Sequence, residues 1–195
     1  MRFVYLLSVL LLSTVLCAQQ LTPVADTLMV ENEKGVVYGE VKWGYQDEGG
    51  NWKVPPVYDY AGPFSEGMAP VGIFDKVDGW KYGYINEQGI LVINLMYDAI
   101  GRFSEGLAYV AILNISWVDK PEEKKYHKIG YIDKTNNMVI TLPAEFSKPS
   151  GNCYYKGEMY SGGFARLKKS EASCSGMPPL VIDRSSTVQI VKEQN

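Results

Sequence analysis

The chain contains one pattern written twice, with an offset of 39 residues, for example from Gly44 to Gly83. In both copies a Gly-Tyr pair is followed by a Tyr-Asp pair and then by a Phe-Ser-Glu-Gly block. The two Tyr-Asp pairs begin at Tyr58 and Tyr97, and the two blocks at Phe64 and Phe103. Because three separate blocks share one offset, we expect a repeat array, in which each unit buries its apolar face against its neighbours.

Two looser copies follow. A Gly-Tyr-Ile-Asp run begins at Gly130, and Tyr160–Leu167 takes the place of the Phe-Ser-Glu-Gly block and the apolar residues after it. A partial copy at 180–190 ends the pattern, as expected of a capping half-unit. The expected units are 41–80, 81–127, 128–179 and a partial unit at 180–190, preceded by a tether or leading strand at 19–40 and followed by a tail at 191–195.

Within one unit the residues predict antiparallel strands. Lys81–Ile85 and Ile90–Ile93 are rich in aromatic and β-branched residues, and Asn86–Gly89 joins them as a hairpin turn. Leu107–Leu113 is continuously apolar, so both of its faces should be covered. Pro55-Pro56 is expected to end a strand. The predicted fold class is all-β, a tandem array of short antiparallel hairpins that forms an open, curved sheet or a solenoid-like stack, preceded by an N-terminal signal helix.

The recurring glycine of the Gly-Tyr pair needs a physical cause, because glycine inside a strand costs conformational entropy. We expect an aromatic ring from a neighbouring strand or unit to lie across its bare backbone. The repeated tyrosines and phenylalanines should form two aromatic rows, which we interpret as core packing. The repeat-defining residues are thus Trp43, Gly44, Tyr45, Phe64, Gly83, Tyr84, Phe103, Gly130 and Tyr131.

These combined motifs resemble the WG-repeat family of bacterial proteins. The Trp-Gly pair that names the family is present at Trp43-Gly44, whereas Tyr82 and Ile129 replace the tryptophan in later units. The resemblance covers about Val41–Ile190. It implies a β-rich repeat scaffold, common in exported or surface proteins of bacteria, with no shared catalytic residues and no common ligand.

The N-terminal residues 1–18 are typical of a signal peptide. Arg2 supplies a positive charge, Phe3–Leu16 is apolar, and Ala18 is a small residue suited to cleavage. The apolar run is shorter than the ~20 residues that a membrane helix needs, and no later run is long enough either. We expect export to the periplasm, the outer surface or the medium. In the alternative interpretation Cys17 is a lipid anchor, although Leu16 stands where lipoprotein signals have a small residue.

Export of the chain would change the oxidation state expected of Cys153 and Cys174. Two thiols in an oxidising compartment favour a disulfide. It would close a loop of about 20 residues and stabilise the fold by roughly 3 kcal/mol. The alternative is two buried free thiols. Two cysteines and the single His127 make an incomplete metal site, so neither a metal nor another cofactor is expected.

The repeated acids suggest a pair of catalytic carboxylates only at first sight. Glu66 and Glu105 precede glycine in matching turns, and Asp59 and Asp98 follow matching tyrosines. Catalysis needs one asymmetric group of residues, whereas a residue that recurs in each unit serves the geometry of the unit. Turn capping explains these acids better. The chain also lacks a nucleophile elbow and a phosphate loop, so it is not expected to be an enzyme.

We expect an exported, non-catalytic scaffold that binds a protein or an envelope component. A net charge of −3 without a basic stripe argues against nucleic acid. The insertion at 114–128 carries Trp117 and Tyr126, the first candidates for recognition outside the repeated surface.

Two alternatives to this function stay open. Asp78–Asn86 resembles the Gly-Trp…Tyr-Tyr pattern of choline- and glucan-binding repeats, which favours a cell-wall carbohydrate- or choline-binding module. That function requires Trp43, Trp80, Tyr82 and Tyr84 to be accessible. The other alternative is a purely structural role in the envelope.

Overall fold

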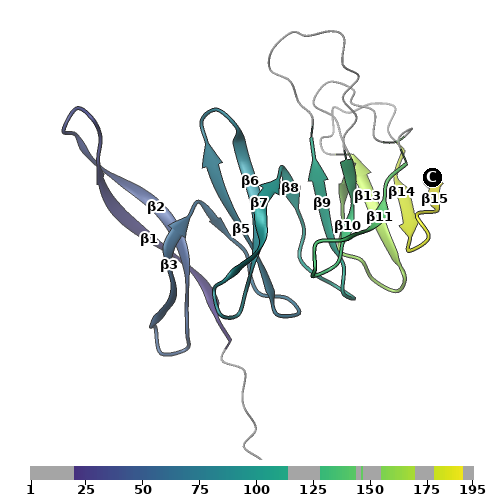
Figure 1. Ribbon diagram of the computed structural model, residues 1–195, viewed down its shortest axis with the longest axis horizontal. Helices are drawn as coiled ribbons and strands as arrows, with labels where there is room; N and C mark the ends of the chain where they lie inside the picture. The colour runs from purple at the N-terminus through teal and green to yellow at the C-terminus, as the bar shows by residue number, and fades with distance from the viewer. Residues whose placement is uncertain (1–19, 114–127, 144–145, 147–154, 170–177, 191–195) are drawn as a thin grey trace, which may run out of the picture.

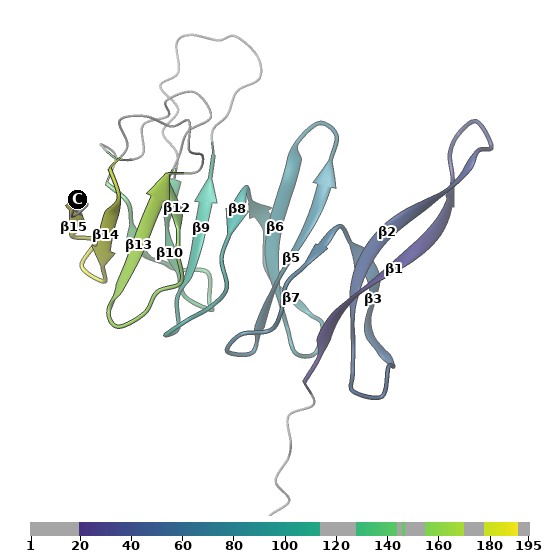
Figure 2. The ribbon, with the colours of Figure 1, turned by 180° about the vertical axis from the view of Figure 1, so that it is seen from behind.

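The computed structural model describes residues 20–113, 128–143, 146, 155–169 and 178–190, and all regular secondary structure within them is β-strand (Figure 1). The described strands form four small antiparallel sheets that follow one another along the molecule and do not close into a barrel (Figure 2). The predicted all-β repeat of hairpins is thus confirmed. The expected signal helix at 1–18 and the cysteines Cys17, Cys153 and Cys174 lie outside the described residues.

The first sheet joins the leading segment to the first sequence unit, and each later sheet joins the end of one unit to the start of the next. The first sheet consists of β1 (Thr22–Glu31), β2 (Val37–Gln46) and β3 (Trp52–Tyr58). The second consists of β4 (Tyr60–Ala61), β5 (Met68–Asp75), β6 (Gly79–Asn86) and β7 (Leu91–Tyr97). The third consists of β8 (Ala99–Ile100), β9 (Ala108–Ile112), β10 (Lys128–Ile132) and β11 (Met138–Thr141). The fourth consists of β12 (Tyr155–Gly157), β13 (Phe164–Lys169), β14 (Leu180–Asp183) and β15 (Val188–Ile190).

The hydrophobic cores lie between neighbouring sheets. Buried apolar side chains of the described residues fall into three clusters, and each cluster draws on two successive sheets. Representative pairs are Tyr45 with Val71, Tyr84 with Val110, and Tyr131 with Leu167. As expected for the apolar run at 107–113, residues 108–111 of β9 are buried. Each sheet therefore completes the core of its neighbour, as in other repeat arrays.

The Gly-Tyr pair requires glycine because the backbone of the neighbouring strand lies very close to it. A Cβ atom at Gly83 would overlap the carbonyl oxygen of Ile93, and one at Gly44 would overlap that of Val54. The same holds for Gly130 against Ile140. The expectation that an aromatic ring covers these glycines is therefore wrong. The neighbouring strand itself fills the space that a side chain would need.

A bulge in the partner strand produces this close approach. On β2 the register advances two positions, from Trp43 to Tyr45, while on β3 it covers four positions, from Tyr58 to Val54. The extra residues of β3 include Pro55-Pro56, which lie inside the strand and do not end it as expected. Proline donates no ladder hydrogen bond, and a bulge is one of the few places where a strand accepts it. The bulge thus accommodates both the prolines and the glycine.

One turn geometry closes five hairpins. In each, an Asp or Asn side chain accepts hydrogen bonds from the backbone N–H groups two and four residues later. The residue three positions later has a positive φ, which glycine adopts most easily. The turns begin at Asn32, Asp47, Asn86, Asp133 and Asp183.

Among these five turn residues, Asp47 has a buried side chain. Its pKa predicts how the free energy of unfolding changes at acidic pH. The N–H of Asn51, the Asn51 amide, the Lys53 ammonium and the N–H of Gly49 lower its pKa to about 2. The folded pKa lies below the ordinary value of 3.8, so Asp47 stabilises the fold above that pH. This stabilisation is lost as the pH falls toward 2.

Asp47→Asn replaces the carboxylate with an amide, the group that Asn86 provides in the equivalent turn. We expect this variant to lose less stability than the parent between about pH 4 and pH 2. Urea unfolding at a series of pH values measures it. Asp78→Asn, in an exposed loop, is the control and should follow the parent curve. Identical slopes for Asp47→Asn and the parent would contradict the assignment.

Candidate binding surface

The repeated tyrosines are structural. Tyr45, Tyr84 and Tyr131 are fully buried, and burial raises the pKa of each phenol. Their hydroxyls donate to the backbone carbonyls of Gly62 at 2.8 Å, Gly101 at 2.6 Å and Glu158 at 2.8 Å. Their rings meet, edge to face, those of Phe64 at 5.1 Å, Phe103 at 4.9 Å and Tyr160 at 5.9 Å between centroids. The interpretation of both aromatic rows as core packing is confirmed.

The repeated aspartates join successive sheets. Asp59 lies between β3 and β4, where one carboxylate oxygen accepts from Lys42 Nζ at 2.6 Å and the other from the N–H of Phe74 at 2.8 Å. Asp98 makes the same two contacts one repeat later, with Lys81 Nζ at 2.5 Å and the N–H of Leu113 at 2.6 Å. Both carboxylates thus hold the bend at which the chain passes from one sheet to the next.

The repeated glutamates connect successive turns. Glu66 and Gly67 both have positive φ, which defines the two-residue hairpin turn of the Phe-Ser-Glu-Gly block. The Glu66 carboxylate accepts from the N–H of Gly106 at 3.0 Å, in the same turn of the next copy. Glu105 likewise accepts from the N–H of Gly162 at 2.7 Å. The expected capping of backbone N–H groups by these acids is confirmed, and each capped N–H group belongs to the next copy of the repeat.

A family comparison agrees with this geometry. The family described as WG containing repeat matches at residues 43–76 and 82–114, which hold the two best copies. The chain thus contains two WG repeats. No curated protein and no solved structure matches it significantly. Across the residues that the structure describes, no helix is long and apolar enough to cross a membrane.

In this repeat array, residues that break the repeat are the natural candidates for function, because the repeated ones are engaged in packing and turns. The second sheet carries three such aromatic side chains, Tyr60, Phe74 and Trp80, and beside them the repeated aromatic position Tyr82. One offset away, Ala99 stands in the place of Tyr60, Leu113 in that of Phe74 and Val41 in that of Trp80. Only Tyr82 has an aromatic counterpart, Trp43.

These four rings, which we call the aromatic surface, are in contact. The centroids of Tyr60 and Tyr82 are 5.7 Å apart, those of Tyr82 and Trp80 5.5 Å, and those of Trp80 and Phe74 5.5 Å. Tyr82 and Trp80 are nearly parallel, with an interplanar angle of 7°. Tyr60, Phe74 and Trp80 are exposed, and Tyr82 is half-buried.

The aromatic surface rests on a fixed backbone. A Cβ atom at Gly72 would lie 2.5 Å from the ring of Tyr82, so the missing side chain lets the ring pack closely against β5. The N–H of Phe74 is held by Asp59, the joint between the first two sheets. Tyr60 directly follows that joint in the chain. The rings are therefore anchored to regular strands, which favours a preformed surface.

The structure separates the residues that the sequence proposed for binding. Trp80 is exposed, Trp43 and Tyr82 are half-buried, and Tyr84 is fully buried. Carbohydrate or choline binding required all four to be accessible, and Tyr84 does not meet this condition. Trp117 and Tyr126 lie outside the described residues. Sequence reasoning missed Tyr60 and Phe74, although their departure from the repeat was a usable signal.

Proposed function

We propose that this chain is an exported, non-catalytic scaffold that binds another protein through the aromatic surface. The observation that carries the proposal is the group of three exposed rings at non-repeated positions, Tyr60, Phe74 and Trp80, which are connected through the half-buried Tyr82. Aromatic side chains bury a large apolar area, and Trp and Tyr are enriched among the residues that dominate binding energy. An isolated exposed ring needs no explanation, whereas a connected group on one sheet points to an interface.

The remaining features support a scaffold in the cell envelope or outside the cell. The N-terminal 18 residues have the character of a signal peptide. An open, solenoid-like array presents a broad surface, and its variable loops can add specificity. The insertion with Trp117 and Tyr126 is a second place for recognition in this proposal.

A cell-wall glycan is the second candidate ligand. Trp80 is exposed and nearly parallel to Tyr82, and such rings can stack on a sugar or face a quaternary amine. The burial of Tyr84 removes one of the four rings on which that function depended. Protein binding therefore remains the leading proposal.

Substitution of Trp80 tests the proposal against a closely matched control. Trp80 is 38% exposed and Trp52, on the first sheet, is 37% exposed, so Trp80→Ala and Trp52→Ala remove the same group at similar accessibility. We expect Trp80→Ala to reduce recovery of envelope proteins at least tenfold in a quantitative pull-down, which corresponds to a loss of about 1.4 kcal/mol of binding free energy or more. Trp52→Ala should recover what the parent recovers.

Two outcomes would overturn protein binding at this surface. One is equal recovery by both variants. The other is Trp80-dependent sedimentation of the chain with protein-free cell-wall glycan, which would establish the second candidate. Thermal melting of each variant shows that the fold is retained.

A further inference from the structure

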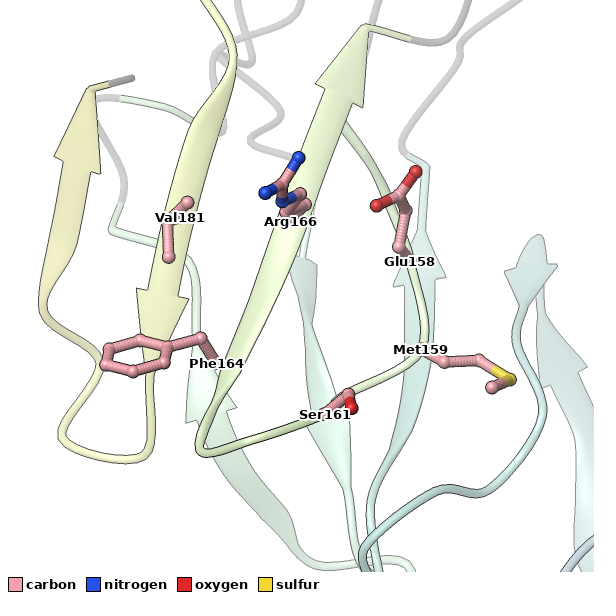
Figure 3. A pocket seen from close by; sticks show the side chains of 6 residues that line it. All are labelled: Glu158, Met159, Ser161, Phe164, Arg166 and Val181. Atoms are coloured by element: carbon pink, nitrogen blue, oxygen red, sulfur yellow. The ribbon is translucent and has the colours of Figure 1, made fainter. Parts of the chain in front are cut away.

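The outer face of the fourth sheet holds a groove that the proposed function does not use (Figure 3). On β13, Ala165 and Leu167 are buried in the core, whereas Phe164, Arg166 and Lys168 are exposed on the opposite face. The groove has a volume of about 380 Å³. Its lining residues are Glu158, Met159, Ser161, Phe164, Arg166 and Val181.

Arg166 is at the centre of this groove, between Val181 on β14 and Glu158 (Figure 3). The Arg166 carbonyl accepts from the N–H of Glu158 at 2.8 Å, which sets the two residues side by side. The Glu158 carboxylate, however, is ion-paired with Lys168. Among the described residues no carboxylate lies within ion-pair distance of the Arg166 guanidinium.

The groove is locally positive although the whole chain is not. Lys156 pairs with Lys168 across β12 and β13, so both exposed lysines lie on the face of the sheet that carries Arg166. The described acids on this face are Glu158, which is ion-paired with Lys168, and Asp183, which lies opposite Phe164. The complete chain has a net charge of −3. A positive groove on a negatively charged protein favours an anionic ligand through complementary charge.

The walls of the groove are apolar. Phe164 and Met159 are exposed, and Val181 is half-buried beside Arg166. A phenyl ring, a thioether and an isopropyl group match aliphatic or aromatic side chains. An acidic sugar would instead need several polar side chains for its hydroxyls, and this groove offers Ser161, Glu158 and Arg166 alone. The combination fits a carboxylate with apolar neighbours.

We propose that this groove binds an extended segment of a partner protein in which an acidic residue is flanked by apolar residues. The guanidinium of Arg166 pairs with the acidic side chain, for which its planar fork offers two parallel hydrogen bonds. The flanking side chains lie against Phe164, Met159 and Val181. This site is independent of the aromatic surface, which lies on the second sheet.

A peptide array tests the proposal with synthetic segments in place of the partner protein. The array carries heptapeptides with Asp, Glu, Asn or Gln at the centre and every pair of amino acids on its two sides. The intact purified chain should bind peptides with an acidic centre and apolar flanks at least tenfold better than the matched amide peptides. Equal binding to acid and amide peptides, or no binding to either, would refute the groove as an acidic-peptide site.

Variants separate Arg166 from the general charge of the protein. Arg166→Gln should abolish the preference for acid over amide, because it removes the fork and leaves the apolar walls in place. Lys34→Gln, in the exposed turn between β1 and β2, makes the same change in net charge and should bind as the parent does. If Arg166→Gln kept the preference, the assignment of the carboxylate to Arg166 would be wrong. Arg166 is exposed, so thermal melting should be unchanged in this variant.

Discussion

Replacing Gly83 with alanine is expected to lower the free energy of unfolding by about 3 kcal/mol, at the upper end of what overpacking in a core costs. The new methyl group would overlap the carbonyl oxygen of Ile93 and lie 2.8 Å from that of Asn94. Both obstacles are backbone atoms in a bulge, so no side-chain rotation relieves them. Urea unfolding followed by circular dichroism measures the change.

Gly39→Ala is the matched control within a strand. Gly39 is exposed on β2, and the nearest atom to its new Cβ would be a methyl group of the exposed Thr27 side chain at 2.9 Å. That side chain can rotate away, so we expect a change within about 0.5 kcal/mol, as for other surface substitutions. If both variants lost the same stability, close backbone approach would not explain the recurring glycine.

The parts of the fold that sequence predicted are those in which local chemistry and repetition agree. The hairpin of β6 and β7 followed from aromatic and β-branched runs on either side of Asn86–Gly89, and the two strands pair as expected. Burial of Tyr45, Tyr84 and Tyr131 followed from their recurrence, because an aromatic at a repeated position packs between units.

Contacts across long sequence separations could not be predicted. Lys134 donates to the carbonyl of Glu66 at 2.6 Å, and Arg184 to that of Glu105 at 2.8 Å. The partners are 68 and 79 residues apart, and nothing in the local sequence shows that these side chains meet. The cause of the recurring glycine was also inaccessible, because it depends on the bulge in a different strand.

The aromatic surface was hidden for a related reason. Trp80 and Tyr82 stand out on one strand, but Phe74 comes from β5 and Tyr60 from β4. Only the register, which pairs Phe74 with Trp80 and Tyr60 with Gly72, brings the four rings together. A repeat array helps here, because it supplies an expected residue at each position. Departures from that expectation then mark positions that packing does not explain.

The shared core between the second and third sheets is tested most strongly at Tyr84. Tyr84→Ala is expected to lower the free energy of unfolding by about 3–5 kcal/mol, as for other large-to-small changes of buried aromatics. The ring is fully buried against Phe103, and its loss opens the cluster that both sheets complete. Chemical unfolding of the purified variants gives the value.

Two further tyrosine variants divide that loss into its causes. Tyr84→Phe keeps the ring but leaves the Gly101 carbonyl without its donor at 2.6 Å, which should cost about 1–3 kcal/mol. Tyr38→Ala removes an exposed tyrosine from β2 and should cost less than about 1 kcal/mol. The order Tyr84→Ala, Tyr84→Phe, Tyr38→Ala follows if neighbouring sheets stabilise each other through the buried ring and its hydroxyl. Equal losses for Tyr84→Ala and Tyr38→Ala would mean that each sheet is stable without the core it shares with the next, and the array would then be a string of independent hairpins.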